Sequence, residues 1–394
     1  MNTLIPDASP KGRYSTTPIV ERTFTAIAAL LFTGLFLAGC GAPAYRDVSF
    51  EPMPMMYGDT ARTGEPFAKD PTVIRLGGRY LMYYSARGYS DVYMPSAEEY
   101  AAGPLAACAT AADLAASDTA VTAPQTDVRP SNMLKGGWHS AIAESRDLVN
   151  WTRVGDMDLR SARGEAIWGA TAPCVKVFDG KVHMFYQRWY AGAGTGGNNV
   201  IFHATSSDGL HFRNTTDEPV LIPRTGWSIE RAIDAEVYRV GEKMILLFAT
   251  RDLSGEIQML AMAEAPYDSD YGPDKWTLLS TDGPLLEPEY EWEGHCIEAP
   301  TVIKHKGLWY MFYAGAYNHE HQQIGLAVSK DGYNFERVGE NGLVYTSGPE
   351  GSWNAGESGH PGVFRDDDGL TYLFYQGKAS HDADYLLSVS RIGF

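Results

Sequence analysis

The sequence predicts an all-β fold, a five-bladed β-propeller, from three observations. A hairpin-like pattern occurs five times, at 70–84, 172–186, 234–248, 294–315 and 360–375. Each copy has a short β-branched strand, a turn marked by Gly or Asp, and an aromatic-rich strand. The Pro-x-Val positions fall at 71, 173, 235, 300 and 361, with Ala in place of Pro at 235, so the intervals are 102, 62, 65 and 61. A period near sixty fits one blade per repeat, because a hairpin buries its aromatic faces only by stacking against neighbours.

Each blade also has a second half. Apolar strands that run into Ser-x-Asp or its equivalent and then an aromatic residue follow at 140–151, 201–212, 257–276 and 324–335. The last copy, 385–391, stops after one strand, so segment 44–51 is expected to close the ring against blade five. An Ala-rich insertion at about 88–135 explains the long first interval.

The N-terminus predicts a secretion signal rather than part of the fold. Arg22 precedes an apolar run at 25–38, which is shorter than the roughly 20 residues that span a bilayer. Residues 37–40, Leu-Ala-Gly-Cys, resemble the bacterial lipobox, which implies lipidation of Cys40. The expected organisation is a lipoprotein signal peptide at 1–40, a linker at 41–62 and the propeller at 63–394. The expected location is the bacterial cell envelope, periplasmic or on the outer-membrane surface, with membrane contact only through the lipid.

Composition excludes some classes of function. The 394 residues carry a net charge of −17, which argues against a nucleic acid partner because phosphates would be repelled. Cys108, Cys174 and Cys296 lack metal-ligand spacing, so no zinc site is expected. Cys174 and Cys296 are expected as buried thiols, although the sequence leaves a disulfide between them open.

Three carboxylates stand at the start of the first strand in different blades. Asp70 precedes Pro71, Asp234 precedes Ala235, and Glu298 lies two residues before Pro300. The first strands of a propeller line its shaft, so these acids are expected to converge at one face. A pair of carboxyl groups is what glycoside hydrolysis needs, one to protonate the leaving oxygen and one to activate water or attack carbon.

The blade starts resemble those of family 43 glycoside hydrolases and their five-bladed relatives in families 32, 62, 68 and 117. The resemblance rests on 69–73, 168–173, 232–237, 297–300 and 357–363 and covers about 65–394. It implies that Asp70 is the general base, Glu298 the general acid, and Asp234 a third acid that raises the pKa of Glu298. It also implies an inverting glycosidase of oligo- or polysaccharides, which we expect to be an exo-acting furanosidase or pentosidase. Family 32 would instead imply retention with Asp70 as nucleophile.

Two other functions remain open at this level. A phosphorylase of the mannoside-phosphorylase type would need a cationic phosphate pocket, and a non-catalytic glycan-binding lipoprotein would have no turnover to lose. No cofactor is required, but His360 matches a family position near bound calcium or water, so His360 is a candidate metal ligand and a structural calcium is considered. A core histidine bonded to backbone is the competing hypothesis.

Aromatic and cationic residues near the blade starts are candidates for sugar binding, because sugar rings stack on aromatics and hydroxyls need charged or planar partners. Arg231 has two alternatives, to hold Asp234 ionised or to bind a substrate carboxylate. For the aromatic candidates, packing between blades is the competing role. The candidates are Trp168, Arg188, Trp189, Arg231, Trp292, His295, Tyr317, His319 and Trp353.

Overall fold

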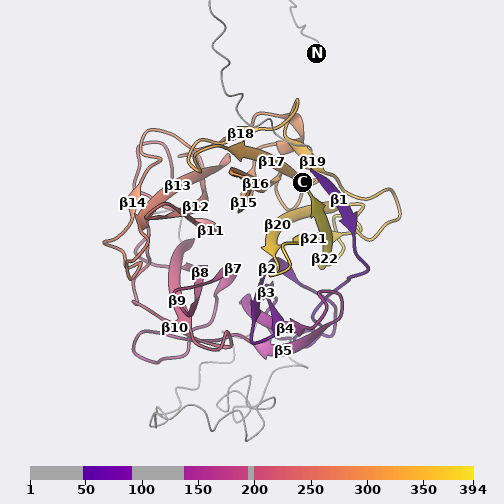
Figure 1. Cartoon of the computed structure of the whole chain (residues 1–394), viewed down its shortest axis with the longest axis horizontal. Helices are drawn as coiled ribbons and strands as arrows, with labels where there is room; N and C mark the ends of the chain where they lie inside the picture. The colour runs from indigo at the N-terminus through magenta and orange to yellow at the C-terminus, as the bar shows by residue number, and fades with distance from the viewer. Residues whose placement is uncertain (1–47, 91–136, 194–198) are drawn as a thin grey trace, which may run out of the picture. The chain divides into compact units, whose positions relative to one another are not determined.

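Five antiparallel sheets surround a common axis, as Figure 1 shows. This computed structural model describes residues 48–90, 137–193 and 199–394. The predicted five-bladed β-propeller is confirmed. The predicted signal peptide, Cys40, Cys108 and nearly all of the predicted insertion lie outside the described residues. None of the described residues forms a helix long and apolar enough to cross a membrane.

Each blade is built outward from the axis. The innermost strands are β2 (Lys69–Leu76), β7 (Thr171–Phe178), β11 (Ile233–Val240), β15 (Ile297–His305) and β20 (Glu357–Arg365). The second strands are β3 (Arg79–Ala86), β8 (Lys181–Trp189), β12 (Lys243–Arg251), β16 (Leu308–Gly315) and β21 (Thr371–Lys378). The third strands are β4 (His139–Ser145), β9 (Asn199–Ser206), β13 (Gln258–Pro266), β17 (Gln323–Ser329) and β22 (Leu386–Gly393).

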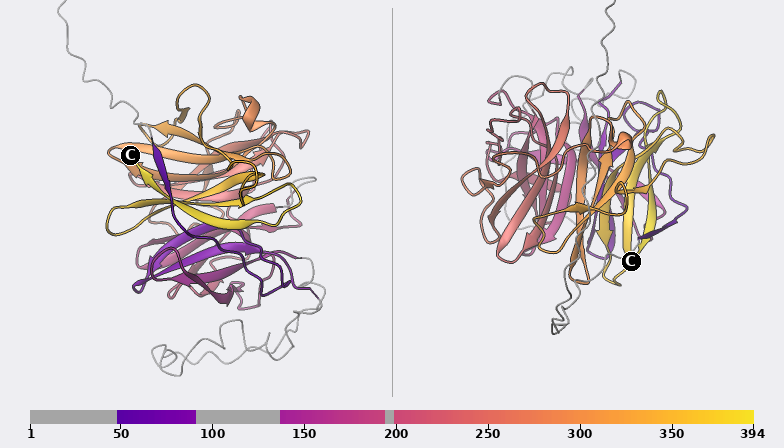
Figure 2. Two further views of the ribbon diagram at one scale, coloured as in Figure 1. Left: turned by 90° about the vertical axis from the view of Figure 1, so that its right-hand side faces the viewer. Right: turned by 90° about the horizontal axis from the view of Figure 1, so that it is seen from above.

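The outer edges are shorter and more varied. The fourth strands are β5 (Trp151–Asp156), β10 (His211–Asn214), β14 (Thr277–Leu278), β18 (Glu336–Arg337) and β1 (Ser49–Pro52). Strand β6 (Asp158–Arg160) adds to β10 in parallel, and β19 (Leu343–Tyr345) pairs with β17. A short 3-10 turn, η2 (Glu291–Glu293), precedes β15. The two side views in Figure 2 show the sheets stacked face to face around the axis.

The five repeated patterns are the hairpins of the two innermost strands in each blade. In blade two the turn between β7 and β8 places Asp179 at φ 50° and Gly180 at φ 72°. Two consecutive positive φ values define the tight turn whose twist matches that of the flanking strands, and Asp and Gly tolerate them best. Short turns of this kind explain why the strands could be paired from the sequence.

Strand β1 closes the ring. Residues Ser49–Pro52 pair antiparallel with β22, so Phe50 stands opposite Ile392. The expectation that a segment near 44–51 completes blade five is therefore confirmed for Ser49–Pro52. The linker prediction for 41–62 is wrong over its described part, since Met55 and Arg62 are both 2% exposed and belong to the propeller.

The hydrophobic core lies between neighbouring blades rather than inside any one of them. Separate clusters join blades one and two, two and three, three and four, four and five, and five and one. Both faces of each sheet are thus buried against a neighbour. Aromatic side chains such as Tyr83, Phe185 and Phe312 are fully buried in these layers, which explains the aromatic second strand of each repeat.

Every innermost strand has the same β-bulge near its start. The pairing register shifts in all five inner hairpins at this point. One residue of each bulge has positive φ, and these residues are Asp70, Ala172, Asp234, Ala299 and His360. Proline follows in four of the five blades, where it removes no ladder hydrogen bond because the bulge already interrupts the ladder. The bulge turns these side chains toward the axis.

Candidate active site

Four ionisable side chains meet at one end of the central shaft. His360 Nδ1 lies 2.9 Å from Asp70 Oδ1, and His360 Nε2 lies 2.8 Å from Glu298 Oε1. Ligand atoms of Asp234, Glu298 and His360 all lie within 4.8 Å of one another. The structure therefore brings together the three acids expected to converge. His360, from blade five, lies between Asp70 and Glu298.

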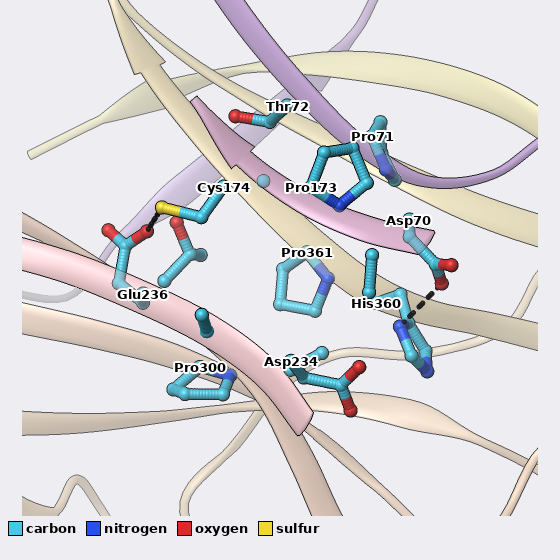
Figure 3. Close-up of a pocket in the computed structure, with 15 residues that line it drawn as sticks. Asp70, Pro71, Thr72, Pro173, Cys174, Asp234, Glu236, Pro300, His360 and Pro361 are labelled. Carbon is cyan, nitrogen blue, oxygen red and sulfur yellow. Dashed lines mark hydrogen bonds and ion pairs between the residues drawn. The ribbon is translucent and has the colours of Figure 1, made fainter. Parts of the chain in front are cut away.

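The shaft below these groups is narrow. Three consecutive residues from each inner strand line a cavity of about 50 Å³ (Figure 3). Going inward, the bulge residues are followed by a layer of Pro71, Pro173, Ala235, Pro300 and Pro361, and then by Thr72, Cys174, Glu236, Thr301 and Gly362. This volume holds water molecules but no sugar ring. A substrate must therefore lie on the outer side of the carboxyl groups.

Glu298 is held by four donors. Its Oε1 accepts from Asn318 Nδ2 at 3.1 Å and from Gln322 Nε2 at 2.9 Å, in addition to the His360 contact. Gln258 Nε2 donates to its Oε2. The side chain is 3% exposed, so this set of donors replaces water around the carboxylate. Donation to the charged form favours ionisation.

Asp234 has a different environment. It is 7% exposed, and its Oδ2 is buried without a hydrogen-bond partner. Its backbone N–H donates to Gln187 Oε1 at 2.9 Å, which fixes the main chain but leaves the carboxyl group unsupported. A buried carboxyl group without donors favours its neutral form.

These contacts order the pKa values of the cluster. Burial raises the pKa of Asp234 to about 7; His360 opposes this shift, and Glu298 and Asp70 add to it. Burial acts to raise the pKa of Glu298, but His360, Lys69 and Gln322 lower it to about 2. Burial also acts to raise the pKa of Asp70. Lys69 and His360 outweigh it and hold this pKa well below the usual range of an aspartate.

The histidine shift completes this pattern. Burial acts to lower the pKa of His360, but Glu298 and Asp70 raise it to about 10. These shifts favour an imidazolium between two carboxylates in the free site, and they make Asp234 the carboxyl group with the highest proton affinity. In this substrate-free arrangement the pKa of Glu298 is lowered and that of Asp234 is raised, because Glu298 has four donors and Asp234 Oδ2 has none. The role of Asp234 as a third acid that raises the pKa of Glu298 stays a prediction.

The candidate metal ligand His360 was tested against this geometry. Asp234, Glu298 and His360 offer three ligand atoms, but both ring nitrogens of His360 already contact carboxylate oxygens. A nitrogen that donates a proton has no free lone pair for a cation, and Ca²⁺ prefers six to eight oxygen ligands. The side chains as arranged fit a shared proton rather than a calcium ion.

Three of the predicted sugar-binding aromatics pack against other side chains, Trp168 buried and Trp292 and Trp353 half-buried. Trp168 is 7% exposed, stacks on His139 with ring centroids 4.2 Å apart, and donates to the Gly137 carbonyl. Trp292 donates to the Asn341 carbonyl and packs beside Tyr313. Trp353 packs beside Tyr375. For these residues the packing role, which the sequence left as the alternative, is the one their contacts support.

Other predicted residues lie around the acids or apart from them. Tyr317 stacks with His319 at 5.5 Å and donates to the Glu256 carbonyl, and His319 and His295 are exposed. Arg188 lines a separate cavity of about 230 Å³ with Ser161, Arg163, Glu165, Ile167, Asn214 and Asp217. Trp189, 59% exposed, ends the same strand. Arg231 lies three residues before Asp234 at the start of blade three.

The amide side chains that contact the acids were not among the site residues predicted from the sequence. Gln258, Asn318 and Gln322 contact Glu298, while Gln376 Oε1 accepts from the Asp70 backbone N–H at 3.3 Å. Lys69 Nζ, 3.9 Å from Asp70 Oδ1, also donates to Asn318 Oδ1 at 2.9 Å. One signal was available, because Gln187 and Gln376 each follow a Phe-Tyr pair that ends the aromatic strand of a repeat.

The cysteine question is settled for the described residues. Cys174 and Cys296 are both free and buried, as the thiol hypothesis expected. Cys174 Sγ donates to Glu236 Oε2 at 3.3 Å in the inner layer of the shaft. No disulfide joins the two.

Comparisons with known proteins give a family match and a shared fold. A family model described as "Glycosyl hydrolases family 43" matches residues 136–390. A curated relative, the sucrose-6-phosphate hydrolase of Streptococcus mutans serotype c, is 27% identical over 167 residues, which cover 41% of this chain. The matched part spans about a third of that enzyme's length, 33%.

Solved structures show the same fold. A thermostable family-43 glycoside hydrolase has a TM-score of 0.56 at 20% identity, over 86% of this chain and 93% of its own. An exo-1,5-α-L-arabinanase from a bovine ruminal metagenomic library has a TM-score of 0.50 at 14% identity, over 84% of this chain and 94% of its own.

Proposed function

This chain belongs to glycosyl hydrolases family 43, a family of enzymes that cleave glycosidic bonds, and on that premise we propose that it hydrolyses an oligo- or polysaccharide with inversion. Asp70 is the general base and Glu298 the general acid. The observation that carries the proposal is the cluster in which Asp70 and Glu298 flank the His360 ring, at 2.9 and 2.8 Å, with Asp234 beside them.

The width of an imidazole ring between the carboxylates supports inversion. Inverting glycosidases keep their two carboxyl groups about 6.5 to 9.5 Å apart to admit a water molecule, whereas retaining enzymes keep them about 5 to 5.5 Å apart. Asp70 and Glu298 contact different nitrogens of one ring, and a ring between the two carboxyl groups favours the wider spacing. The low pKa of Asp70 keeps it ionised, as a base must be to take a proton from water.

Glu298 has to gain a proton before it can act as the general acid, because its lowered pKa favours the ionised form in the free site. Glu298 must carry a proton when the glycosidic oxygen leaves, and the nearest protons are on His360 Nε2 and on the Asp234 carboxyl group. We place this transfer after substrate binding, when the glycosidic oxygen replaces a donor at Glu298. Asp234 then becomes the carboxylate, so one proton serves the pair.

The sugar is proposed from the kind of proteins that share the fold. Solved neighbours include an exo-1,5-α-L-arabinanase and an α-L-arabinofuranosidase, which supports an exo-acting furanosidase or pentosidase. The shaft below the acids is too narrow for a sugar ring, so the substrate is expected to bind on the outer side of the acids. Aryl arabinofuranosides, xylosides and galactosides, with fructan as a comparison, form the first substrate panel.

The test combines turnover with stereochemistry. We expect Glu298→Ala and Asp70→Asn each to lower kcat by about 10²- to 10⁴-fold while the folded structure is kept. Proton NMR of the first-formed anomer should show inversion, and EDTA should leave turnover unchanged. Turnover that requires inorganic phosphate would identify a phosphorylase instead. Sugar binding without turnover on the whole panel, unchanged in Glu298→Ala, would identify a glycan-binding protein.

A further inference from the structure

Arg231 and Arg251 lie on neighbouring segments at the open end of the β11–β12 hairpin in blade three. Arg251 ends β12, and its carbonyl accepts from the Ile229 N–H at 3.0 Å. Two residues earlier on β12, Ala249 pairs with Ile233. Arg231 lies between Ile229 and Ile233, so the two arginines occupy adjacent segments at the end of the hairpin that carries Asp234. Like charges this close oppose each other unless an anion joins them.

Arg251 is directed toward the acid side of the site. Its Nε donates to Gln258 Oε1 at 2.9 Å, and its guanidinium carbon lies 5.2 Å from the centre of the Tyr317 ring. Gln258 uses its Nε2 to hold Glu298. A single amide therefore separates this guanidinium from the proposed general acid.

The Arg231 guanidinium group has a hydrogen-bond donor without an acceptor. Its Nε is buried and has no hydrogen-bond partner, and the Asp234 Oδ2 atom is also without one. No ion pair joins Arg231 to Asp234 in the described part of the chain, so the hypothesis that Arg231 holds Asp234 ionised is not supported. Burial and the nearby Arg251 lower the pKa of the Arg231 guanidinium, whereas Asp234 and Glu298 act to raise it.

Two other buried or half-buried arginines of the described residues are paired with acids. Arg62 contacts Asp156 at 2.8 Å, and Arg337 contacts Glu293 at 2.8 Å. Over residues 48–90, 137–193 and 199–394, neither Arg231 nor Arg251 has such a carboxylate. Since the protein as a whole carries a net charge of −17, only a local pair of cations of this kind would attract an anion.

We propose that Arg231 and Arg251 bind the carboxylate of a uronic acid residue next to the scissile bond. The inference rests on the proposed glycosidase function for the bond that is cut, and it names the substrate class as an acidic glycan. The planar guanidinium fork matches a carboxylate with two parallel N–H···O bonds. A substrate carboxylate would give the half-buried Arg231 guanidinium the anionic partner that it lacks among the described residues.

Binding to the full chain tests this separately from turnover. Calorimetric titration at low salt should show galacturonic or glucuronic acid binding more tightly than galactose or glucose. In Arg231→Gln the affinity for the uronic acid should fall by about tenfold or more, while the affinity for the neutral sugar should not change. Arg231→Lys should recover only part of the loss, because an ammonium group lacks the fork.

A matched control comes from the same hairpin. Arg239, at the opposite end of β11, bonds to Gly241 and Glu242, so Arg239→Gln should leave uronate binding unchanged. Circular dichroism and thermal melting confirm that the variants are folded. If Arg231→Gln is unfolded, Arg251→Gln makes the same test.

The outcomes separate the two proposals. Equal affinity for acidic and neutral sugars, or tighter binding of inorganic phosphate or a sulfated sugar than of the uronic acid, would overturn the inference while leaving hydrolysis intact. A different outcome is uronate binding that depends on Arg231 in a protein that turns over none of the substrates. That result would support the carboxylate-binding role of Arg231 and contradict the hydrolase proposal.

Discussion

At the scale of single residues, the site works through an uneven distribution of hydrogen-bond donors. Glu298 and Asp234 are both buried carboxyl groups, yet Glu298 has four donors and Asp234 Oδ2 has none. That difference decides which group keeps the proton, since burial alone would raise both pKa values. Two acids in similar burial thus have pKa values shifted in opposite directions.

The pH profile should report this proton. The raised pKa of Asp234, about 7, means that the carboxyl group is protonated below pH 7 and loses its proton as the pH rises through 7. We expect kcat/KM to fall on the alkaline side with an apparent pKa near 7, because Asp234 then has no proton to pass to Glu298, whereas His360, with its pKa raised to about 10, keeps its own. In Asp234→Asn this limb should disappear and the maximal rate should fall. An alkaline limb that stays near pH 7 in Asp234→Asn would refute the assignment.

At the scale of elements, the repeated bulge turns a strand into a catalytic support. In every blade the residue with positive φ interrupts the inner ladder, and five such residues surround the axis. Two of them are Asp70 and Asp234, and a third is His360, while Ala172 and Ala299 carry only methyl groups. The same backbone feature therefore places ionisable side chains at the axis in three blades and alanines in the other two.

The ring-closing strand is an element whose contribution to stability can be measured. Phe50 in β1 packs edge-on against Phe312 and Tyr345, with ring centroids 6.2 and 5.0 Å apart. We expect Phe50→Ala to lower the free energy of unfolding by about 1–3 kcal/mol, because it removes packing between the first and last parts of the chain. Denaturant unfolding measures the effect.

Glu51 provides the control for that experiment. It neighbours Phe50 and forms only an exposed ion pair with Arg391, so Glu51→Ala should change stability by less than about 0.5 kcal/mol. If both variants unfold at the wild-type denaturant concentration, β1 does not stabilise the ring.

At the scale of the whole molecule, ring closure shortens the proposed tether. We propose that Cys40 carries a lipid, and β1 begins at Ser49, so only eight residues, 41–48, separate the two. A fully extended chain spans at most about 3.3–3.6 Å per residue, which keeps the catalytic domain within about 30 Å of the membrane surface. A linker extending to residue 62 would have allowed a much longer reach.

Fractionation of cells that express the full chain tests the anchor. Cys40→Ser should move the protein out of the membrane fraction, because the only proposed contact with the membrane is the lipid. Cys108→Ser, which leaves the lipobox-like motif intact, should remain with the membrane. Wild-type protein found outside the membrane fraction would contradict lipidation.

The sequence by itself determined the number of blades, the inner hairpins and the convergence of Asp70, Asp234 and Glu298. These features follow from local patterns, since alternating apolar strands, Gly or Asp turns and a fixed repeat register are written along the chain. The propeller could therefore be predicted before any contact was known.

Only the tertiary structure decided which group holds the proton and which aromatics are free. His360, Gln258, Asn318 and Gln322 reach Glu298 from three blades, and no local pattern encodes contacts between residues so far apart in the chain. For the same reason Trp168 and Trp292 could not be distinguished from sugar-binding residues until their neighbours were known. Protonation depends on burial and on the donors nearby, and the closed ring sets both.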